Sequence, residues 1–133
     1  MIALDTNVLV RILLDDDPQQ HAATRRLLDS LSIERPGYVS SVVLVETYWV
    51  LVRTRGIDAS TVLAAFRRMQ ATPEFRGPAR LVDALDAADS GADFADALID
   101  ASARSAGVRT IATFDKRAAR RLGWTLLGRD PLP

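Results

Sequence analysis

The sequence predicts one α/β domain with a mainly parallel central sheet flanked by helices. Short apolar runs alternate with amphipathic helical stretches along the chain, a pattern typical of parallel strands joined by helices. No internal repeat and no low-complexity linker interrupts this alternation. The length of 133 residues is ordinary for one domain. We therefore expect a single domain over residues 1–133.

The individual elements follow from the spacing of apolar residues and from the residues that end each run. Short apolar runs predict strands at 1–4, 38–40, 108–113 and 124–127. Apolar residues at helical spacing predict helices at 7–14, 19–31, 42–55, 60–70, 78–89, 93–106 and 116–122. The acidic run at 15–17, directly before Pro18, predicts a solvated loop between the first two helices.

Composition excludes several classes of function. The 17 basic residues balance the 17 acidic ones, which excludes a nucleic-acid binder held by strong overall positive charge. The chain has no cysteine, which excludes disulfides, thiolate zinc sites and cysteine nucleophiles. His21 is the one histidine, so a metal site built from several histidines of one chain is excluded as well.

The apolar runs also bear on where the protein works. None approaches the roughly 20 residues that a membrane-spanning helix needs. The N-terminal run lacks the form of a signal peptide, because Asp5 interrupts it at once. We therefore expect a soluble, cytoplasmic protein without a membrane partner.

Two acids directly follow predicted strands. Asp5 ends the run at 1–4, and Asp115 comes two residues after the strand at 108–113. Functional side chains gather at the carboxyl ends of strands in parallel sheets, so both acids are candidate site residues. The alternative is that each carboxylate caps the helix that follows it, and the two roles can coexist.

Glu46 lies in a helical stretch that is apolar nearly all round, which predicts a buried helix. A buried carboxylate costs several kcal/mol unless it is paired or bound to a metal ion. The alternative to a metal ligand is a salt bridge to Arg11 or Arg53.

Asp93, Asp96 and Asp100 are spaced so that they share one face of the helix at 93–106. Three like charges on one face are unfavourable without a cation. Alternatively, Asp93 caps this helix and Asp96 interacts with its positive end. Several carboxylates without a histidine cluster favour Mg²⁺ or Mn²⁺, and this chemistry suits hydrolysis of a phosphodiester.

These acids also carry a family resemblance. The chain resembles PIN-domain ribonucleases, in particular the VapC-type toxins of bacterial toxin–antitoxin pairs. Four segments match the family's motifs in order, and the match covers nearly the whole chain. The segments are Ile-Ala-Leu-Asp-Thr-Asn-Val-Leu at 2–9, Ser-Ser-Val-Val-Leu-Val-Glu at 40–46, Gly-Ala-Asp-Phe-Ala-Asp-Ala-Leu-Ile at 91–99 and Thr-Phe-Asp at 113–115.

The resemblance implies a PIN-like domain and metal-dependent endoribonuclease activity. It implies that Mg²⁺ or Mn²⁺ is held by four catalytic acids: Asp5, Glu46, Asp96 and Asp115. It implies supporting roles for Thr6, Asn7, Thr113 and Asp93, the last as auxiliary ligand, indirect support or helix cap. It further implies an RNA substrate, a cognate antitoxin that enters the active-site groove, and a homodimer.

Basic residues near the first and fourth motifs are candidate contacts for RNA phosphates or antitoxin carboxylates. They are Arg11, Lys116, Arg117, Arg120 and Arg121. The alternative is an ordinary solvated helix face.

Two other classes of function also place acids at strand ends. A receiver-like regulatory module leaves Glu46 unexplained, and Lys116 stands directly after Asp115, which is a poor position for the lysine of a receiver. A phosphatase with an aspartate nucleophile usually carries two Asp residues two positions apart, whereas position 7 is Asn. A PIN domain that only binds and has lost catalysis is the remaining alternative.

Overall fold

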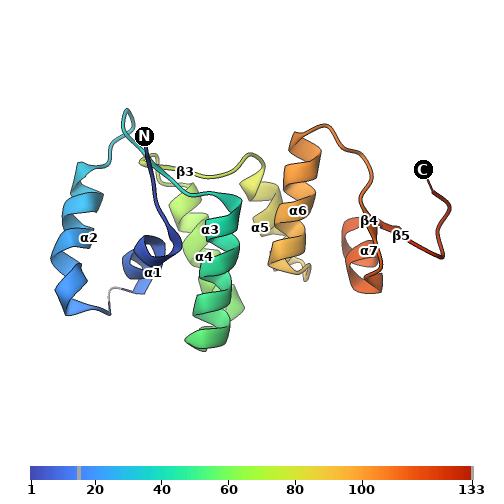
Figure 1. Ribbon diagram of the computed structural model, residues 1–133, viewed down its shortest axis with the longest axis horizontal. Helices are drawn as coiled ribbons and strands as arrows, with labels where there is room; N and C mark the ends of the chain where they lie inside the picture. The colour runs from blue at the N-terminus through green and yellow to red at the C-terminus, as the bar shows by residue number, and fades with distance from the viewer. Residues whose placement is uncertain (15, 133) are drawn as a thin grey trace. The chain divides into compact units, whose positions relative to one another are not determined.

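The computed structural model describes residues 1–14 and 16–132, so residue 15 of the predicted acidic loop and residue 133 lie outside the described residues. The chain divides into two compact units, Met1–Pro78 and Ala79–Pro133. Figure 1 labels the helices α1–α7 and the strands β3–β5 along the chain. Helices and parallel strands alternate in both units, which confirms the predicted α/β class. The expectation of one domain over the whole chain remains a prediction.

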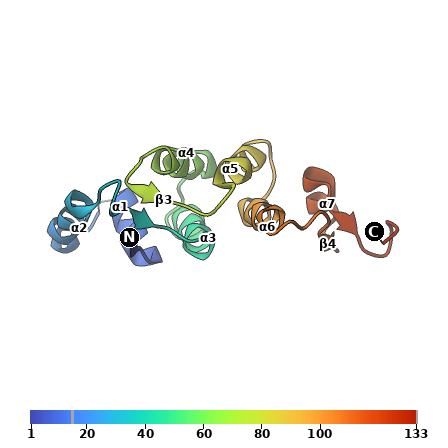
Figure 2. The same ribbon diagram turned by 90° about the horizontal axis from the view of Figure 1, so that it is seen from above.

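The first unit contains a three-stranded parallel sheet, with strands in the order β1-β2-β3. Its elements are β1 (Ile2–Ala3), α1 (Thr6–Leu14), α2 (Pro18–Ser30), β2 (Gly37–Tyr38), α3 (Ser41–Trp49), the π-helical turn η1 (Val50–Thr54), α4 (Ala59–Gln70) and β3 (Phe75–Arg76). Seen from above, β2 and β3 lie between α4 on one side and α1 and α3 on the other (Figure 2). The buried side chains Leu9, Leu44 and Phe66 come from these three helices and form part of the core.

Gly37 occupies the middle of this sheet, paired with Ile2 on one side and Phe75 on the other. A Cβ atom at this position would lie 3.1 Å from Leu31 Cδ1 and 3.2 Å from Leu4 Cδ1. These contacts are closer than ordinary van der Waals packing, so the absence of a side chain lets the surrounding core close over the strand.

The second unit contains a two-stranded parallel sheet and three helices. Its elements are α5 (Leu81–Asp89), α6 (Phe94–Ser105), β4 (Ala112–Thr113), α7 (Lys116–Leu122) and β5 (Thr125–Leu126). Helices α5 and α6 pack against each other, and α7 packs against α6 and both strands. Leu85 and Phe94 are fully or almost fully buried in this unit.

Several element boundaries differ from the sequence-based predictions. The strand β3 is missing from those predictions because two residues carry no recognisable alternation of apolar and polar side chains. The helix expected over 78–89 begins only at Leu81, because Arg80 adopts a left-handed conformation with φ 60°. The helix expected over 42–55 is divided into α3 and η1. Within residues 1–14 and 16–132, no helix has the length and apolar character required to cross a membrane.

Thr47 is an unusual member of the first unit's core. Its side chain is completely buried, and among the described residues its hydroxyl has no hydrogen-bond partner. An unpaired buried hydroxyl has lost its bonds to water without a replacement. The unpaired Thr47 hydroxyl therefore destabilises the first unit.

We predict that Thr47→Val raises the free energy of unfolding by about 1 kcal/mol, because it replaces the unpaired hydroxyl with a methyl group. Denaturant titration of both proteins measures the change. Thr72→Val is the matched control, since the Thr72 hydroxyl donates to the Arg68 carbonyl at 2.8 Å and its removal offers no such gain. Equal stability of Thr47→Val and wild type would contradict the prediction.

Candidate functional site

Asp5 stands at the turn between β1 and α1. Its Oδ1 atom accepts a hydrogen bond from the Val8 amide at 2.9 Å, so the carboxylate caps α1. This confirms the capping role that was left open for Asp5. Among the described residues no hydrogen bond engages Oδ2, so the cap leaves one oxygen for another ligand. Asn7 and Arg11 lie with Asp5 on the wall of a groove of about 350 Å³ between α1 and α2.

Glu46 lies on α3 and is exposed, so the expectation that its helix would be buried on every side is wrong. Val42, one helical turn earlier, is 66% exposed. The two residues share one face of α3 because they are four positions apart. Helix α3 therefore has an apolar side chain, Val42, outside the core, and the Glu46 carboxylate lies on the same exposed face as Val42.

The position of Glu46 is fixed by a contact across the unit. The Thr6 hydroxyl, at the start of α1, donates to Glu46 Oε2 at 2.7 Å. The alternative expected from the sequence is a salt bridge from Glu46 to Arg11 or Arg53. Instead, Arg11 pairs with Asp16 at 2.7 Å, and the Arg53 guanidinium lies over the Trp49 ring. Thr6 thus orients the Glu46 carboxylate.

In the second unit, two further acids cap helices. Asp93 Oδ1 accepts from the Asp96 amide at 3.0 Å at the start of α6. Asp115 Oδ1 accepts from the Arg117 and Ala118 amides at 2.8 and 3.1 Å at the start of α7. Both capping roles are therefore confirmed. The Thr113 hydroxyl accepts from the Asp115 amide at 2.9 Å and so fixes the turn that presents this carboxylate.

Asp96 is the acid of this unit whose carboxyl pKa is raised. Burial raises the pKa of its carboxyl group, and the negative charges of Asp93 and Asp115 raise the pKa further. Each neighbour disfavours ionisation of Asp96, so both Asp93 and Asp115 are close enough to repel the Asp96 carboxylate. A cation in their neighbourhood would reverse this cost.

Asp100 shares the α6 face but has a different role. Its Oδ1 atom accepts from Trp124 Nε1 at 2.9 Å and lies 3.3 Å from Arg104 Nη2. The charge of Asp100 is therefore compensated within the unit. This separates it from Asp93 and Asp96, although spacing alone placed all three acids together.

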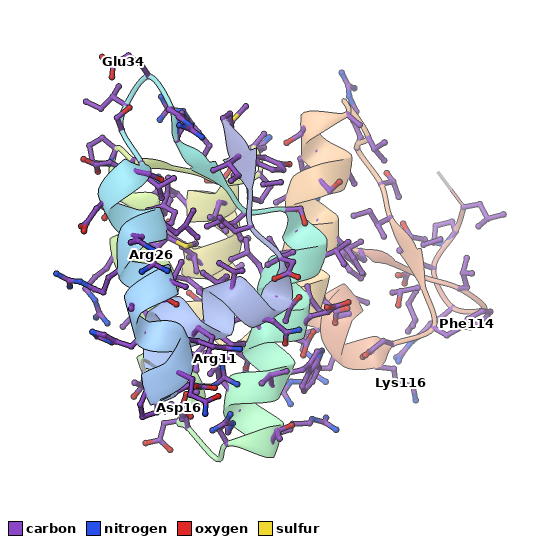
Figure 3. The ribbon with its side chains drawn as sticks, turned by 60° about the vertical axis from the view of Figure 1, so that its left-hand side comes forward. Arg11, Asp16, Arg26, Glu34, Phe114 and Lys116 are labelled. Carbon is purple, nitrogen blue, oxygen red and sulfur yellow. The ribbon has the colours of Figure 1, made fainter. Side chains whose placement is uncertain are left out.

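The basic candidates also divide into two kinds. Arg11 is held by Asp16, and Figure 3 shows the two residues close together near the start of α2. Arg121 Nη1 donates to the Ser90 carbonyl at 3.0 Å, and its guanidinium packs on Gly91, whose φ is +107°. Lys116, Arg117 and Arg120 are exposed on α7. Arg121 thus ties α7 to the turn before Asp93, a role that sequence spacing did not reveal.

Sequence reasoning passed over Phe114, which stands between Thr113 and Asp115 and is 81% exposed. The available signal was an aromatic residue placed in a short turn rather than in an apolar run.

The four motif acids are divided between the two units: Asp5 and Glu46 belong to the first unit, and Asp96 and Asp115 belong to the second. Across the described ranges 1–14 and 16–132, no three acidic or histidine side chains are grouped so as to hold a metal ion.

The raised pKa of Asp96 predicts how stability depends on pH in the absence of metal. The folded-state pKa lies above the ordinary value of 3.8, so folded protein binds the Asp96 proton more tightly than unfolded protein does. Stability from this group is present below 3.8 and is lost as pH rises through the raised folded-state pKa. At neutral pH the ionised group is therefore destabilising.

In chelator at neutral pH, we predict that Asp96→Asn melts at a higher temperature than wild type. The advantage should shrink as the pH falls below the ordinary carboxyl pKa, which thermal melts over a pH series can measure. Asp100→Asn is the matched control on the same helix and should melt lower than wild type, because it loses the charge that pairs with Arg104. An Asp96→Asn protein that melts lower than wild type would contradict this account.

Comparison with known proteins gives the following relationships. A family model described as PIN domain matches residues 2–123. A search of curated proteins finds no match. The chain is similar to the crystal structure of VapC20 from Mycobacterium tuberculosis, a Sarcin-Ricin loop cleaving toxin, with 24% identity, a TM-score of 0.44, and 98% of this chain and 100% of that chain covered. It is also similar to FitAcB from Neisseria gonorrhoeae, with 22% identity, a TM-score of 0.37, and coverage of 94% and 95%. Since the family model spans nearly the whole sequence, the chain belongs to the PIN domain family.

Proposed function

We propose that this protein is a metal-dependent endoribonuclease that acts as the toxin of a toxin–antitoxin pair. The observation that carries the proposal is the PIN domain match over residues 2–123, a range that contains all four motif acids. In this proposal Asp5, Glu46, Asp96 and Asp115 hold Mg²⁺ or Mn²⁺. The reaction is hydrolysis of an RNA phosphodiester bond.

The chemistry of the side chains suits such a cation. All four are carboxylates, and hard oxygen ligands are those that Mg²⁺ and Mn²⁺ prefer. The repulsion of the Asp96 carboxylate by Asp93 and Asp115 supports the proposal, because a divalent cation would remove a cost that the metal-free protein bears. When bound, the cation would lower the pKa of a coordinated water molecule and neutralise charge on the phosphate undergoing hydrolysis.

The protein's own side chains hold the proposed ligands in place. The Thr6 hydroxyl occupies one side of Glu46 Oε2, which restricts the rotation of that carboxylate. The helix-capping bonds use Oδ1 of Asp5 and Asp115, so each side chain is anchored through one oxygen while carrying its full charge. Preorganised carboxylates of this kind lose little side-chain entropy when they bind a ligand.

The biological assignment has separate support. The four motif segments resemble those of VapC-type toxins, a resemblance that supports a cognate antitoxin and a homodimer as partners. Arg or Lys side chains from an antitoxin would neutralise the carboxylates and compete with the cation. Lys116, Arg117 and Arg120 are the exposed candidates on α7 for contacts to RNA phosphates.

We predict that the purified chain cleaves RNA in Mn²⁺ and that excess chelator abolishes the cleavage. Products should carry a 5′-phosphate and a 3′-hydroxyl, because water attacks the phosphorus atom, the bond from phosphorus to the 3′ oxygen breaks, and that oxygen leaves with a proton. End-group analysis of the fragments measures this. Products ending in a 2′,3′-cyclic phosphate would contradict the mechanism.

Matched carboxylate variants separate charge from structure in the same assay. Asparagine caps helices about as well as aspartate, so Asp115→Asn keeps the cap of α7 and loses only its negative charge. We expect Asp115→Asn and Asp96→Asn to lose nearly all cleavage. Asp100→Asn should keep it, because the Asp100 carboxylate is already paired with Arg104 and Trp124.

We also predict that expression of the wild-type chain arrests bacterial growth and that co-expression of a cognate antitoxin restores it. Growth curves of cells expressing the chain alone, the chain with its antitoxin, and Asp96→Asn alone measure the effect. The Asp96→Asn protein should be harmless at equal abundance. If wild type and Asp96→Asn both arrest growth, the toxicity does not depend on the Asp96 carboxylate, and the prediction is wrong.

A further inference from the structure

The second unit has a hollow lined by basic side chains, and none of the four motif acids lines it. It has a volume of about 360 Å³ and is lined by Lys116, Ala119, Arg120, Trp124, Leu126, Arg129 and Asp130. Three cations therefore surround it against one carboxylate. Among the described residues, no hydrogen bond or ion pair engages the Lys116 ammonium or the guanidinium groups of Arg120 and Arg129. Unpaired like charges around a hollow favour an anionic ligand.

The remaining lining residues build the wall of the hollow. Trp124 is 7% exposed and donates through Nε1 to Asp100, so its ring is held in place. Asp130 Oδ2 accepts from the Leu126 amide at 2.7 Å, and the Asp130 amide donates to the Leu126 carbonyl at 2.9 Å. These bonds close the turn that carries Arg129. The one carboxylate is thus bonded within the turn, whereas the three cations that line the hollow are not paired with it.

Phe114 precedes the candidate ligand Asp115 in the sequence, and Lys116 follows it. The Phe114 ring is 81% exposed, the highest exposure of any large apolar side chain among the described residues. Phe114 lies in the connection between β4 and α7, and Lys116 is the first residue of α7; both are labelled in Figure 3. An exposed aromatic ring and a group of cations thus flank Asp115 along the chain.

We propose that this surface binds single-stranded RNA, with Phe114 stacking on a base and the basic hollow holding backbone phosphates. The proposal rests on the proposed ribonuclease function, and it defines how the substrate is held beside Asp115. Aromatic rings combined with cations are the general means of binding single strands without reading sequence. An acidic protein segment would use the cations but has no comparable use for an isolated exposed ring.

The test measures binding of a labelled oligouridylate to the full chain by fluorescence anisotropy, in chelator and over a range of salt concentrations. Chelator separates binding from cleavage. For wild type we expect the logarithm of the association constant to fall linearly with the logarithm of salt concentration. Lys116→Gln, Arg120→Gln and Arg129→Gln should each reduce the steepness of this slope by about 0.7, the value for one phosphate contact on a single strand.

Phe114 variants provide a second readout that behaves differently. Phe114→Leu should weaken binding by about tenfold while leaving the salt slope unchanged, because stacking releases no counterions. Phe114→Tyr should bind as wild type does. Arg109→Gln is the matched charge control, since Arg109 is exposed in the same unit but precedes β4 at its amino end. It should change neither affinity nor slope.

Three results would overturn the proposal. One is an unchanged slope in all three cation variants, and another is equal binding by Phe114→Leu and wild type. The third is that the cation variants lose binding to a polyglutamate peptide but keep binding to oligouridylate, which would assign the hollow to an acidic protein segment. The proposed function fails differently: RNA that binds with the expected slope but stays intact in Mn²⁺ supports the contact surface and refutes the nuclease.

Discussion

The strand-to-helix turns after β1, β2 and β4 each supply a side-chain acceptor for the amides at the start of the next helix, whereas the turn after β3 reaches α5 through the left-handed Arg80 without a side-chain cap. After β1 the acceptor is Asp5, after β2 it is Ser40, whose hydroxyl accepts from the Val43 amide at 3.2 Å, and after β4 it is Asp115. Aspartate meets the requirement through one oxygen and brings a full negative charge with it. The turns that organise the fold therefore also place its acidic side chains, and Ser40 starts the helix that carries Glu46.

This double use of carboxylates has an energetic consequence. A cap on an isolated helix gains from its charge, but Asp93 and Asp115 also raise the pKa of Asp96 through repulsion. Their charges thus stabilise α6 and α7 locally while opposing ionisation of the residue between them. Strain of this sort is expected where a site is arranged for a ligand that the protein must bind. Asp100, on the same helix, shows the contrasting case of a charge that the fold itself satisfies.

Local patterns in the sequence predicted most of this arrangement. The position of α7 and the caps at Asp5, Asp93 and Asp115 depend on neighbouring residues, so spacing was sufficient to find them. The strand β3 could not be found because its two residues show no recognisable alternation of apolar and polar side chains, and its pairing with β2 joins residues far apart in the chain. The exposure of Glu46 and the bond from Arg121 to Ser90 depend on which faces of two distant elements meet. Residue spacing within one helix contains no information about either contact.

The central claim is that the motif acids hold a divalent cation through their charge and not only through their capping bonds. Titration of the metal-free protein with Mn²⁺, followed by electron paramagnetic resonance in the absence of RNA, tests this claim most directly. The account predicts saturable binding by wild type and affinities at least about tenfold weaker for Glu46→Gln and Asp96→Asn. Asp100→Asn should bind as wild type does. Equal Mn²⁺ affinity in wild type, Glu46→Gln and Asp96→Asn would contradict the account.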